Sequence, residues 1–181
     1  MIYRVLTIPM HANIQMKWLM FNLRVLLATL FLTVSGHSHA NLLSGQVVGV
    51  SDGDTITLLE ANKTQHKIRL AGIDAPEKAQ PFGQASKKSL SDLIFNKQVN
   101  VYWEKKDRYQ RILGKVTMGE QDICLEQVKR GMSWHYKQYQ RDQTSEDRMK
   151  YEMAEKEARA NKLGLWSDDS PVEPSKFRHS K

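Results

Sequence analysis

The sequence predicts a fold of the α+β class that is mainly β: a small closed barrel of five short strands, with about three helices packed outside it. Two observations predict this fold. Short β-rich segments recur between residues 44 and 118, and Gly- and Asp-containing turns separate several of them. A segment with helical periodicity interrupts the strands after the third one, and further helical segments follow the fifth.

The first three predicted strands form an antiparallel meander. Segments 44–51 (SGQVVGVS) and 55–59 (TITLL) are rich in residues that favour strands, and Asp52-Gly53-Asp54 lies between them. Asp-Gly between two such runs is a strong hairpin signal. A polar turn at 61–64 then leads into a third strand at 66–73. By the same alternation, the last two strands are predicted at 98–104 and 112–118.

Three helices are expected around the barrel. Residues 82–96 carry apolar side chains at near-helical spacing, although two serines dilute the apolar stripe. A shorter helix is predicted at 124–129, ending at Gly131. A long helix begins at Ser145, with Thr144 or Ser145 as its cap and acidic residues in its first turn.

The first forty residues are predicted to be a signal peptide. Basic residues precede the apolar run 25–34, and the small residues Ser38 and Ala40 follow it, so cleavage is expected after Ala40. The apolar run is too short for a membrane span, which needs about twenty residues. We therefore expect an exported protein, periplasmic or secreted; the alternative is a buried N-terminal helix. A start at Met16 would give a segment of more usual length.

The remaining chain is expected to contain one domain, residues 41–169, followed by a flexible polar tail at 170–181. The formal charge of +7 falls to +4 without residues 1–40, because these contain three basic and no acidic residues. The single cysteine, Cys124, excludes an internal disulfide, and no C-x-x-C or H-E-x-x-H pattern suggests zinc. Basic residues cluster in one stretch: Lys105, Lys106, Arg108, Arg111 and Lys115.

One ten-residue stretch, 68–77 (IRLAGIDAPE), stands out. It places Arg69, Asp74 and Glu77 within nine positions. On a straight strand Arg69 and Asp74 would point to opposite faces, but Gly72 allows the backbone to bend and bring both to one side. By itself, the stretch also fits a strand that runs into a turn with a surface ion pair.

Two further motifs decide between these interpretations. Asp52-Gly-Asp-Thr55 precedes the stretch and Asp107-Arg-Tyr-Gln-Arg111 follows it. In this order, the three motifs resemble the staphylococcal nuclease (micrococcal nuclease, thermonuclease-like) family. The resemblance extends over residues 45–168, including the closing AEKEARANKLGLWSD. It implies a five-stranded OB-type barrel with three helices, in agreement with the fold predicted above.

The resemblance implies a nuclease that cleaves DNA and RNA at the 5′-side P–O bond and leaves 3′-phosphate ends. It implies one calcium ion held by the carboxylates of Asp54 and Asp74 and by the carbonyl of Ala75. Glu77 is implied as the general base acting on a water. The scissile phosphate is implied to be held by two arginines, Arg69 and Arg111, whose paired N–H donors match two phosphate oxygens.

Three more residues are implied to bind substrate. Arg108 and Tyr109 contact a neighbouring phosphate, and Tyr139 packs against a base. The chain departs from the family pattern at several places, including Ala75, Thr117 and a short loop after Glu77, and two further departures concern the binding residues. At the position of Gln110 the best-known member has glycine, although glutamine is also seen in the family, and a positive φ there would cost about 1 kcal/mol. Lys137 stands where a second base-packing aromatic is usual, so stacking is expected to be weaker.

The leading alternative is a catalytically inactive OB-fold domain that only binds nucleic acid. Such domains typically lose the carboxylates or the arginines, all of which this chain keeps, and function is judged from the site rather than from the fold. An exported structural or adaptor domain has no positive feature in its favour. No stable protein partner and no membrane association are expected, and the protein is expected to be a monomer. His135 has no partner at metal-ligand spacing and is expected at the surface.

Overall fold

A computed structural model describes residues 41–180; the predicted signal peptide, residues 1–40, lies outside the described residues. The strands are β1 (Asn41–Val50), β2 (Thr55–Leu59), β3 (Gln65–Leu70), β4 (Ile73–Asp74), β5 (Gln98–Lys106), β6 (Ile112–Met118), β7 (Gln121–Asp122) and β8 (Trp134–His135). The helices are α2 (Gly83–Ile94), α3 (Ile123–Lys129), α4 (Ser145–Ala160) and α5 (Pro174–His179), with 3₁₀ turns η1 (Lys137–Asp142) and η2 (Gly164–Ser167).

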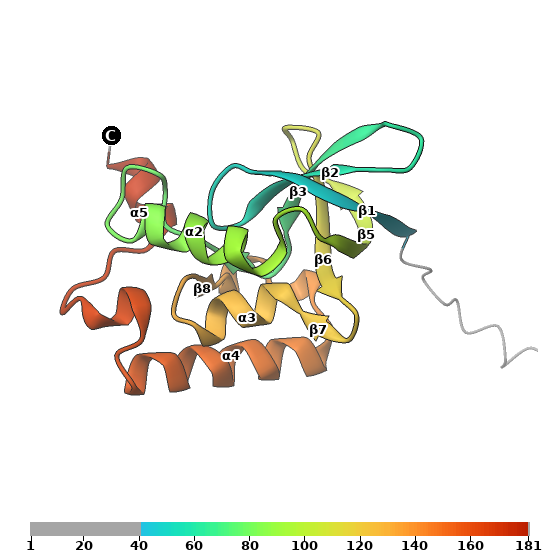
Figure 1. Ribbon diagram of the computed structural model, residues 1–181. Coiled ribbons are helices and arrows are strands. Elements are labelled where there is room, and N and C mark those ends of the chain that lie inside the picture. Colours follow the sequence, from blue (N-terminus) through green and yellow to red (C-terminus); the bar gives the residue numbers. More distant parts are fainter. Residues whose placement is uncertain (1–40, 181) are drawn as a thin grey trace, which may run out of the picture. The chain divides into compact units, whose positions relative to one another are not determined.

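Five strands close into the predicted barrel (Figure 1). They are hydrogen-bonded in the order β3-β2-β1-β5-β6, and β3 pairs with β6 to complete the ring. All pairings in the ring are antiparallel except β3–β6, which is parallel and places Ile68 opposite Ile112. The long strand β1 serves two neighbours, because its first half pairs with β5 and its second half with β2.

The barrel interior is filled by the alternating apolar residues of its strands. Ile56 and Leu58 of β2 and Ile68 and Leu70 of β3 are fully buried. Alternation of this kind is what a strand with one face in a core requires. The prediction of a mainly β barrel from the same alternation is therefore confirmed.

The three predicted helices stack as α2–α3–α4, with α3 in the middle, and α2 and α3 also contact the barrel (Figure 1). The two serines that dilute the apolar stripe of α2 are used as hydrogen-bond donors. Ser86 Oγ donates to Met132 O at 2.6 Å, and Ser89 Oγ donates to Gln127 Oε1 at 2.7 Å. Thr144 caps α4, since its Oγ1 accepts from Asp147 N at 3.1 Å.

The C-terminal segment differs from the expected flexible tail. Residues 174–179 form α5, Pro174 is buried, and Val172 O accepts a hydrogen bond from Gln80 Nε2 at 2.6 Å. The polar composition of the segment could not indicate this, because its partners lie about a hundred residues earlier in the chain. No helix in the described part of the chain is long and apolar enough to cross a membrane.

His135 also differs from its expected surface position. Only 4% of it is exposed, its backbone pairs with Ile73, and its Nε2 lies 2.8 Å from Gln143 Oε1. It is therefore a hydrogen-bonded structural residue, placed inside by the β4–β8 pairing.

Two glycines with positive φ provide a test of the packing between α3 and the segment after α4. A Cβ added to Gly131 (φ 63°) would overlap the carbonyl oxygen of Leu163, whereas a Cβ on Gly119 (φ 59°) would meet nothing within 4 Å. Gly119→Ala should lower the free energy of unfolding by about 1 kcal/mol through backbone strain alone. Gly131→Ala should lower it by about 2–4 kcal/mol, since overpacking adds to the strain. Urea denaturation measures both, and equal losses would contradict the close contact.

Candidate functional site

The bend between β3 and β4 brings Arg69 and Asp74 together, as the motif predicts. β3 ends at Leu70, Gly72 takes a left-handed φ of 75°, and β4 then starts in a new direction. Arg69 Nη2 lies 3.0 Å from Asp74 Oδ1 and 3.0 Å from Asp54 Oδ2. Its Nη1 donates to the carbonyls of Leu70 at 2.8 Å and Ile73 at 2.9 Å. The guanidinium is therefore fixed on one side by the backbone and faces two carboxylates on the other.

Asp54 is held in the turn between β1 and β2. The buried amide of Gln127, on α3, donates to Gly53 O at 3.0 Å, and a Cβ on Gly53 would overlap the hydroxyl of Ser86. A glycine is required here because the turn presses against α2. The carboxylate of Asp54 accepts from Ala75 N at 2.7 Å and from Thr55 Oγ1 at 3.1 Å.

Burial raises the pKa of Asp54 to about 7, an effect opposed by Arg69 and increased by the neighbouring carboxylate of Asp52. Burial likewise raises the pKa of Asp74, although Arg178 and Arg69 oppose the shift. Both shifts have the same cause, because water is largely excluded from these carboxylates and their charged forms are penalised. The site thus holds two carboxylates whose charges are incompletely balanced.

Glu77 lies at the edge of this cluster. Pro76 precedes it, and Gln80 fixes its backbone, since Gln80 Oε1 accepts from Glu77 N at 3.1 Å and Gln80 N donates to Glu77 O at 2.9 Å. Its side chain is 40% exposed, compared with 3% for Asp74. Glu77 therefore keeps access to solvent while its neighbours do not.

A residue from the C-terminal helix joins Glu77 to Asp74. Arg178 Nη1 donates to Glu77 Oε1 at 2.8 Å and to Asp74 Oδ1 at 3.2 Å, and its Nη2 donates to Asp74 Oδ2 at 3.0 Å. Partial burial tends to lower the pKa of Arg178, but the bonds to both carboxylates outweigh it and raise the pKa. The sequence carried no signal for this contact, because Arg178 lies 104 positions after Asp74 in a polar segment.

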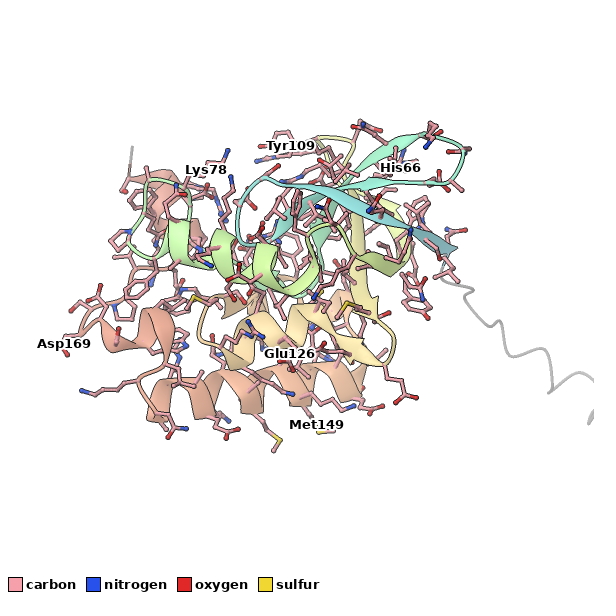
Figure 2. All side chains as sticks on the ribbon, in the orientation of Figure 1. His66, Lys78, Tyr109, Glu126, Met149 and Asp169 are labelled. Atoms are coloured by element: carbon pink, nitrogen blue, oxygen red, sulfur yellow. The ribbon has the colours of Figure 1, made fainter. Side chains whose placement is uncertain are left out.

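Three further predicted site residues, Arg108, Tyr109 and Arg111, lie on the loop between β5 and β6. Asp107 Oδ1 accepts from the backbone N–H groups of Tyr109 at 2.9 Å and Arg111 at 3.0 Å, and its Oδ2 accepts from Arg111 Nε at 2.7 Å. Gln110 has a φ of 62°, as its place in the family's glycine position suggested. The guanidinium carbons of Arg108 and Arg111 lie 4.8 and 5.4 Å from the centre of the Tyr109 ring. Figure 2 shows Tyr109 on the outside of this loop.

Asp107 was not among the predicted site residues, although its spacing of four from Arg111 could have indicated it. Burial tends to raise its pKa, but the hydrogen bonds from Arg111 and Tyr109 outweigh that effect and lower the pKa. Asp107 is therefore an anion that orients Arg111. In this structure Arg111 bonds to Asp107, and none of its described hydrogen bonds or ion pairs reaches the carboxylates of Asp54, Asp74 or Glu77.

Tyr139 lies on η1 with 49% of its surface exposed. Its ring is 4.9 Å from the ring of Tyr136, measured between centres, and Tyr136 and Asp74 line the same pocket. Lys137, at the position where the family has a second aromatic, points to Glu155 instead, with Nζ 2.8 Å from Oε2. The half-exposed ring of Tyr139 therefore lies beside Tyr136, which lines this pocket, and Lys137 offers no aromatic ring.

The donor set suits a hard divalent cation. The described residues contain no group of three or more His, Cys, Asp or Glu side chains placed to hold a metal. They do contain the buried carboxylates of Asp54 and Asp74, which share one guanidinium nitrogen. Arg178 bonds to Asp74 and Glu77, so Asp74 has two cationic partners, Arg69 and Arg178. Carboxylate oxygens completed by a carbonyl and waters are the ligands that Ca²⁺ and Mg²⁺ prefer.

Comparison with known proteins agrees with this geometry. The family model described as "Staphylococcal nuclease homologue" matches residues 67–168. A protein of Haemophilus influenzae named "Uncharacterized endonuclease" is 47% identical over 161 residues, which cover 88% of this chain and 87% of the relative. The protein of Shigella flexneri named "Micrococcal nuclease" is 40% identical over 174 residues, or 91% of this chain and 97% of the relative.

A third relative, "Protein ParB" of Escherichia coli, is 36% identical over 165 residues, covering 86% of this chain and 90% of the relative. The barrel, the arrangement of Asp54, Arg69 and Asp74, and these matches over most of the chain lead to the same assignment. The chain belongs to the staphylococcal nuclease family.

Proposed function

We propose that the protein is a nuclease that hydrolyses phosphodiester bonds of DNA and RNA with little sequence specificity, using one calcium ion and leaving 3′-phosphate ends. The observation that carries the proposal is the cluster of Asp54, Arg69 and Asp74, with Glu77 joined to it through Arg178. A domain that only bound nucleic acid would gain nothing from burying two carboxylates, because they repel phosphate and are costly to desolvate. The similarity to proteins named as nucleases supports the same function.

In this proposal Asp54 and Asp74 hold the ion, and the carbonyl of Ala75 completes the protein ligands. When bound, the ion would neutralise negative charge on the phosphate as the nucleophile adds. Arg69 lies between the two carboxylates and is 11% exposed, and its Nη2, which bonds to both carboxylates here, would be shared with a phosphate. Arg111, oriented by Asp107, would approach the phosphate from the neighbouring loop.

Glu77 would act as the general base. It is the most exposed of the three carboxylates, so its oxygens can reach a water that the buried carboxylates cannot. It would take one proton as the water attacks phosphorus. The P–O bond on the 5′ side then breaks, the leaving oxygen acquires a proton from solvent, and the phosphate stays on the 3′ end. Tyr139 and the pair Arg108–Tyr109 would hold flanking nucleotides.

Substitutions should separate metal binding from proton transfer. Asp54→Asn removes one of two anionic ligands, so calcium binding should weaken strongly and activity should return in part at high calcium. Glu77→Gln cannot accept a proton, so kcat should fall by about 10²–10⁴ and excess calcium should not restore it. Steady-state kinetics at several calcium concentrations measure both effects.

Two further variants serve as controls for these kinetics. Glu146→Gln makes the same chemical change as Glu77→Gln on a side chain that is 72% exposed and forms an ion pair with Lys150, far from the site in the sequence, so it should leave activity unchanged. Arg111→Ala should lower kcat/KM without changing calcium binding. Calcium rescue of Glu77→Gln would disprove its role as the base. If Asp54→Asn and Glu77→Gln both cleaved nucleic acid as fast as wild type, the proposed mechanism would be disproved.

The pKa of Asp54 predicts a pH dependence of stability in metal-free protein. The pKa of Asp54 is about 7 in the folded state and near 4, the ordinary aspartate value, in the unfolded state. Between pH 4 and pH 7 the folded state therefore holds this proton more tightly than the unfolded state does. The free energy of unfolding should therefore decrease as pH rises through this window, by a few kcal/mol at most. Asp54→Asn should remove this part of the decrease. Urea denaturation with EDTA at pH 5 and pH 8 measures it, and parallel pH profiles for both proteins would contradict the shift.

Binding should be electrostatic and modest, since residues 41–181 carry only +4. Affinity for single-stranded DNA, measured with EDTA to prevent cleavage, should fall as salt rises. Arg108→Ala should reduce that salt dependence by about one phosphate contact. Lys88→Ala, on the exposed face of α2 and paired with Asp92, is the control and should leave the slope unchanged. If the affinity of wild type and of Arg108→Ala fell equally with salt, Arg108 would not be part of the binding surface.

A further inference from the structure

The C-terminal helix α5 depends on contacts outside itself. It contains six residues, Pro174–His179, and helices of this length are unstable in water on their own. Within α5 only Pro174 is buried. The position of the helix must therefore be fixed by what its side chains bind.

Its main polar anchor is the site itself. Arg178 donates to both oxygens of Asp74 and to one oxygen of Glu77, at 2.8–3.2 Å. Together with Arg69, it places a second guanidinium on the same buried carboxylate. Arg178 therefore neutralises the carboxylates of Asp74 and Glu77, on which the proposed chemistry depends.

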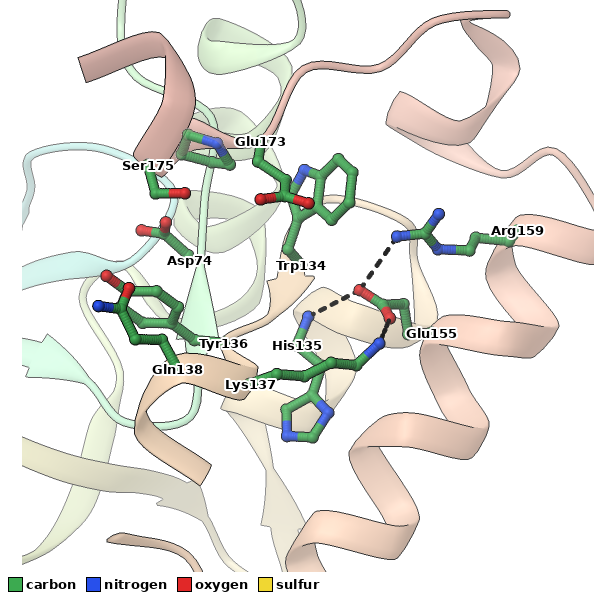
Figure 3. Close-up of a pocket in the computed structure, with 11 residues that line it drawn as sticks. Asp74, Trp134, His135, Tyr136, Lys137, Gln138, Glu155, Arg159, Glu173 and Ser175 are labelled. Carbon is green, nitrogen blue, oxygen red and sulfur yellow. Dashed lines mark hydrogen bonds and ion pairs between the residues drawn. The ribbon is translucent and has the colours of Figure 1, made fainter. Parts of the chain in front are cut away.

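The packing beneath α5 is open. A pocket of about 150 Å³ lies there, lined on one side by Glu173, Pro174 and Ser175 and on the other by Asp74, β8, η1 and α4. Figure 3 shows Ser175 and Glu173 across this space from Tyr136 and Lys137. The helix can therefore move away without opening the main hydrophobic core, to which it contributes no residue.

A second anchor lies just before the helix and differs in kind. Gln80 Nε2 donates to Val172 O, and Gln80 Oε1 accepts from the backbone of Glu77. This bond holds the segment preceding α5 beside the Glu77 loop without using either carboxylate. Release of Arg178 would thus free the helix while the preceding segment stays attached.

We infer that α5 is an internal latch: Arg178 bonds to Asp74 and Glu77, and it must leave before a divalent cation can bind at Asp74 and a phosphodiester can reach Glu77. The inference rests on the proposed function for the identity of the cation. Competition follows from charge, because a divalent cation on the oxygens of Asp74 would face the guanidinium of Arg178 at close range. The latch would raise the cation concentration needed for half-maximal activity, because only the fraction of the protein with the latch open can bind the cation.

The test compares the wild-type protein with Arg178→Gln, which removes the positive charge but keeps a long polar side chain. Lys176→Gln is the matched control, because it makes the same charge change on the same helix and its ion pair is with Glu173, 3.4 Å away. Calcium affinity without nucleic acid is measured by titration calorimetry. Hydrogen exchange of the peptide containing residues 170–180 reports docking of α5, with and without calcium.

If the latch exists, Arg178→Gln should bind calcium about tenfold more tightly than wild type, or 1.4 kcal/mol, and Lys176→Gln should bind as wild type does. Calcium should speed exchange of α5 in wild type, and Arg178→Gln should show fast exchange without it. Equal exchange of α5 in metal-free wild type and Arg178→Gln would overturn the latch whatever the metal does. Equal calcium affinities would overturn the competition.

Failure of the proposed function gives a different result. Suppose that neither protein bound calcium while α5 still exchanged fast in Arg178→Gln. The proposed calcium site would then be wrong, and calcium could not be the signal that opens the latch. If both bound calcium equally and neither cleaved nucleic acid, the nuclease and the latch would both be disproved. Tighter calcium binding by Arg178→Gln without cleavage would support the latch and contradict the nuclease.

Discussion

The site depends on one guanidinium nitrogen. Nη2 of Arg69 lies 3.0 Å from both Asp54 and Asp74, two carboxylates whose pKa values burial raises and this cation opposes. Without this shared donor, two like charges would face one another where water cannot separate them. The backbone carbonyls of Leu70 and Ile73 hold the other nitrogen, so the position of the charge is set by the chain reversal at Gly72.

Other parts of the fold bring the partners to this nitrogen. Gln127 of α3 fixes the turn that carries Asp54, and the β4–β8 pairing fixes Asp74 opposite Trp134. Gln80 fixes the backbone of Glu77. Each partner is held by a buried or backbone hydrogen bond, an arrangement that keeps charged groups in place before any ligand arrives.

Local patterns account for what the sequence could predict. Alternation in TITLL and the Asp-Gly turn indicated the meander, and IRLAGIDAPE contained both partners of the Arg69–Asp74 pair within six residues. What it could not predict depends on distant partners. His135 is inside because β8 pairs with Ile73, and Arg178 reaches the site because a short polar helix docks 104 positions after Asp74. From its polar composition alone, the segment 170–181 was expected to be a flexible tail.

The parallel pairing of β3 with β6 has a consequence for the order of folding. It joins Ile68 to Ile112, so the ring can close only after a long intervening segment, including all of α2, has been arranged. Contacts between residues so far apart in sequence form slowly, because the chain entropy of the loop is lost before the contact stabilises anything. Residues 107–111, which directly precede β6 and include Arg108 and Arg111, therefore come next to β3 only at ring closure. A partly folded chain carries the same residues but has no assembled site.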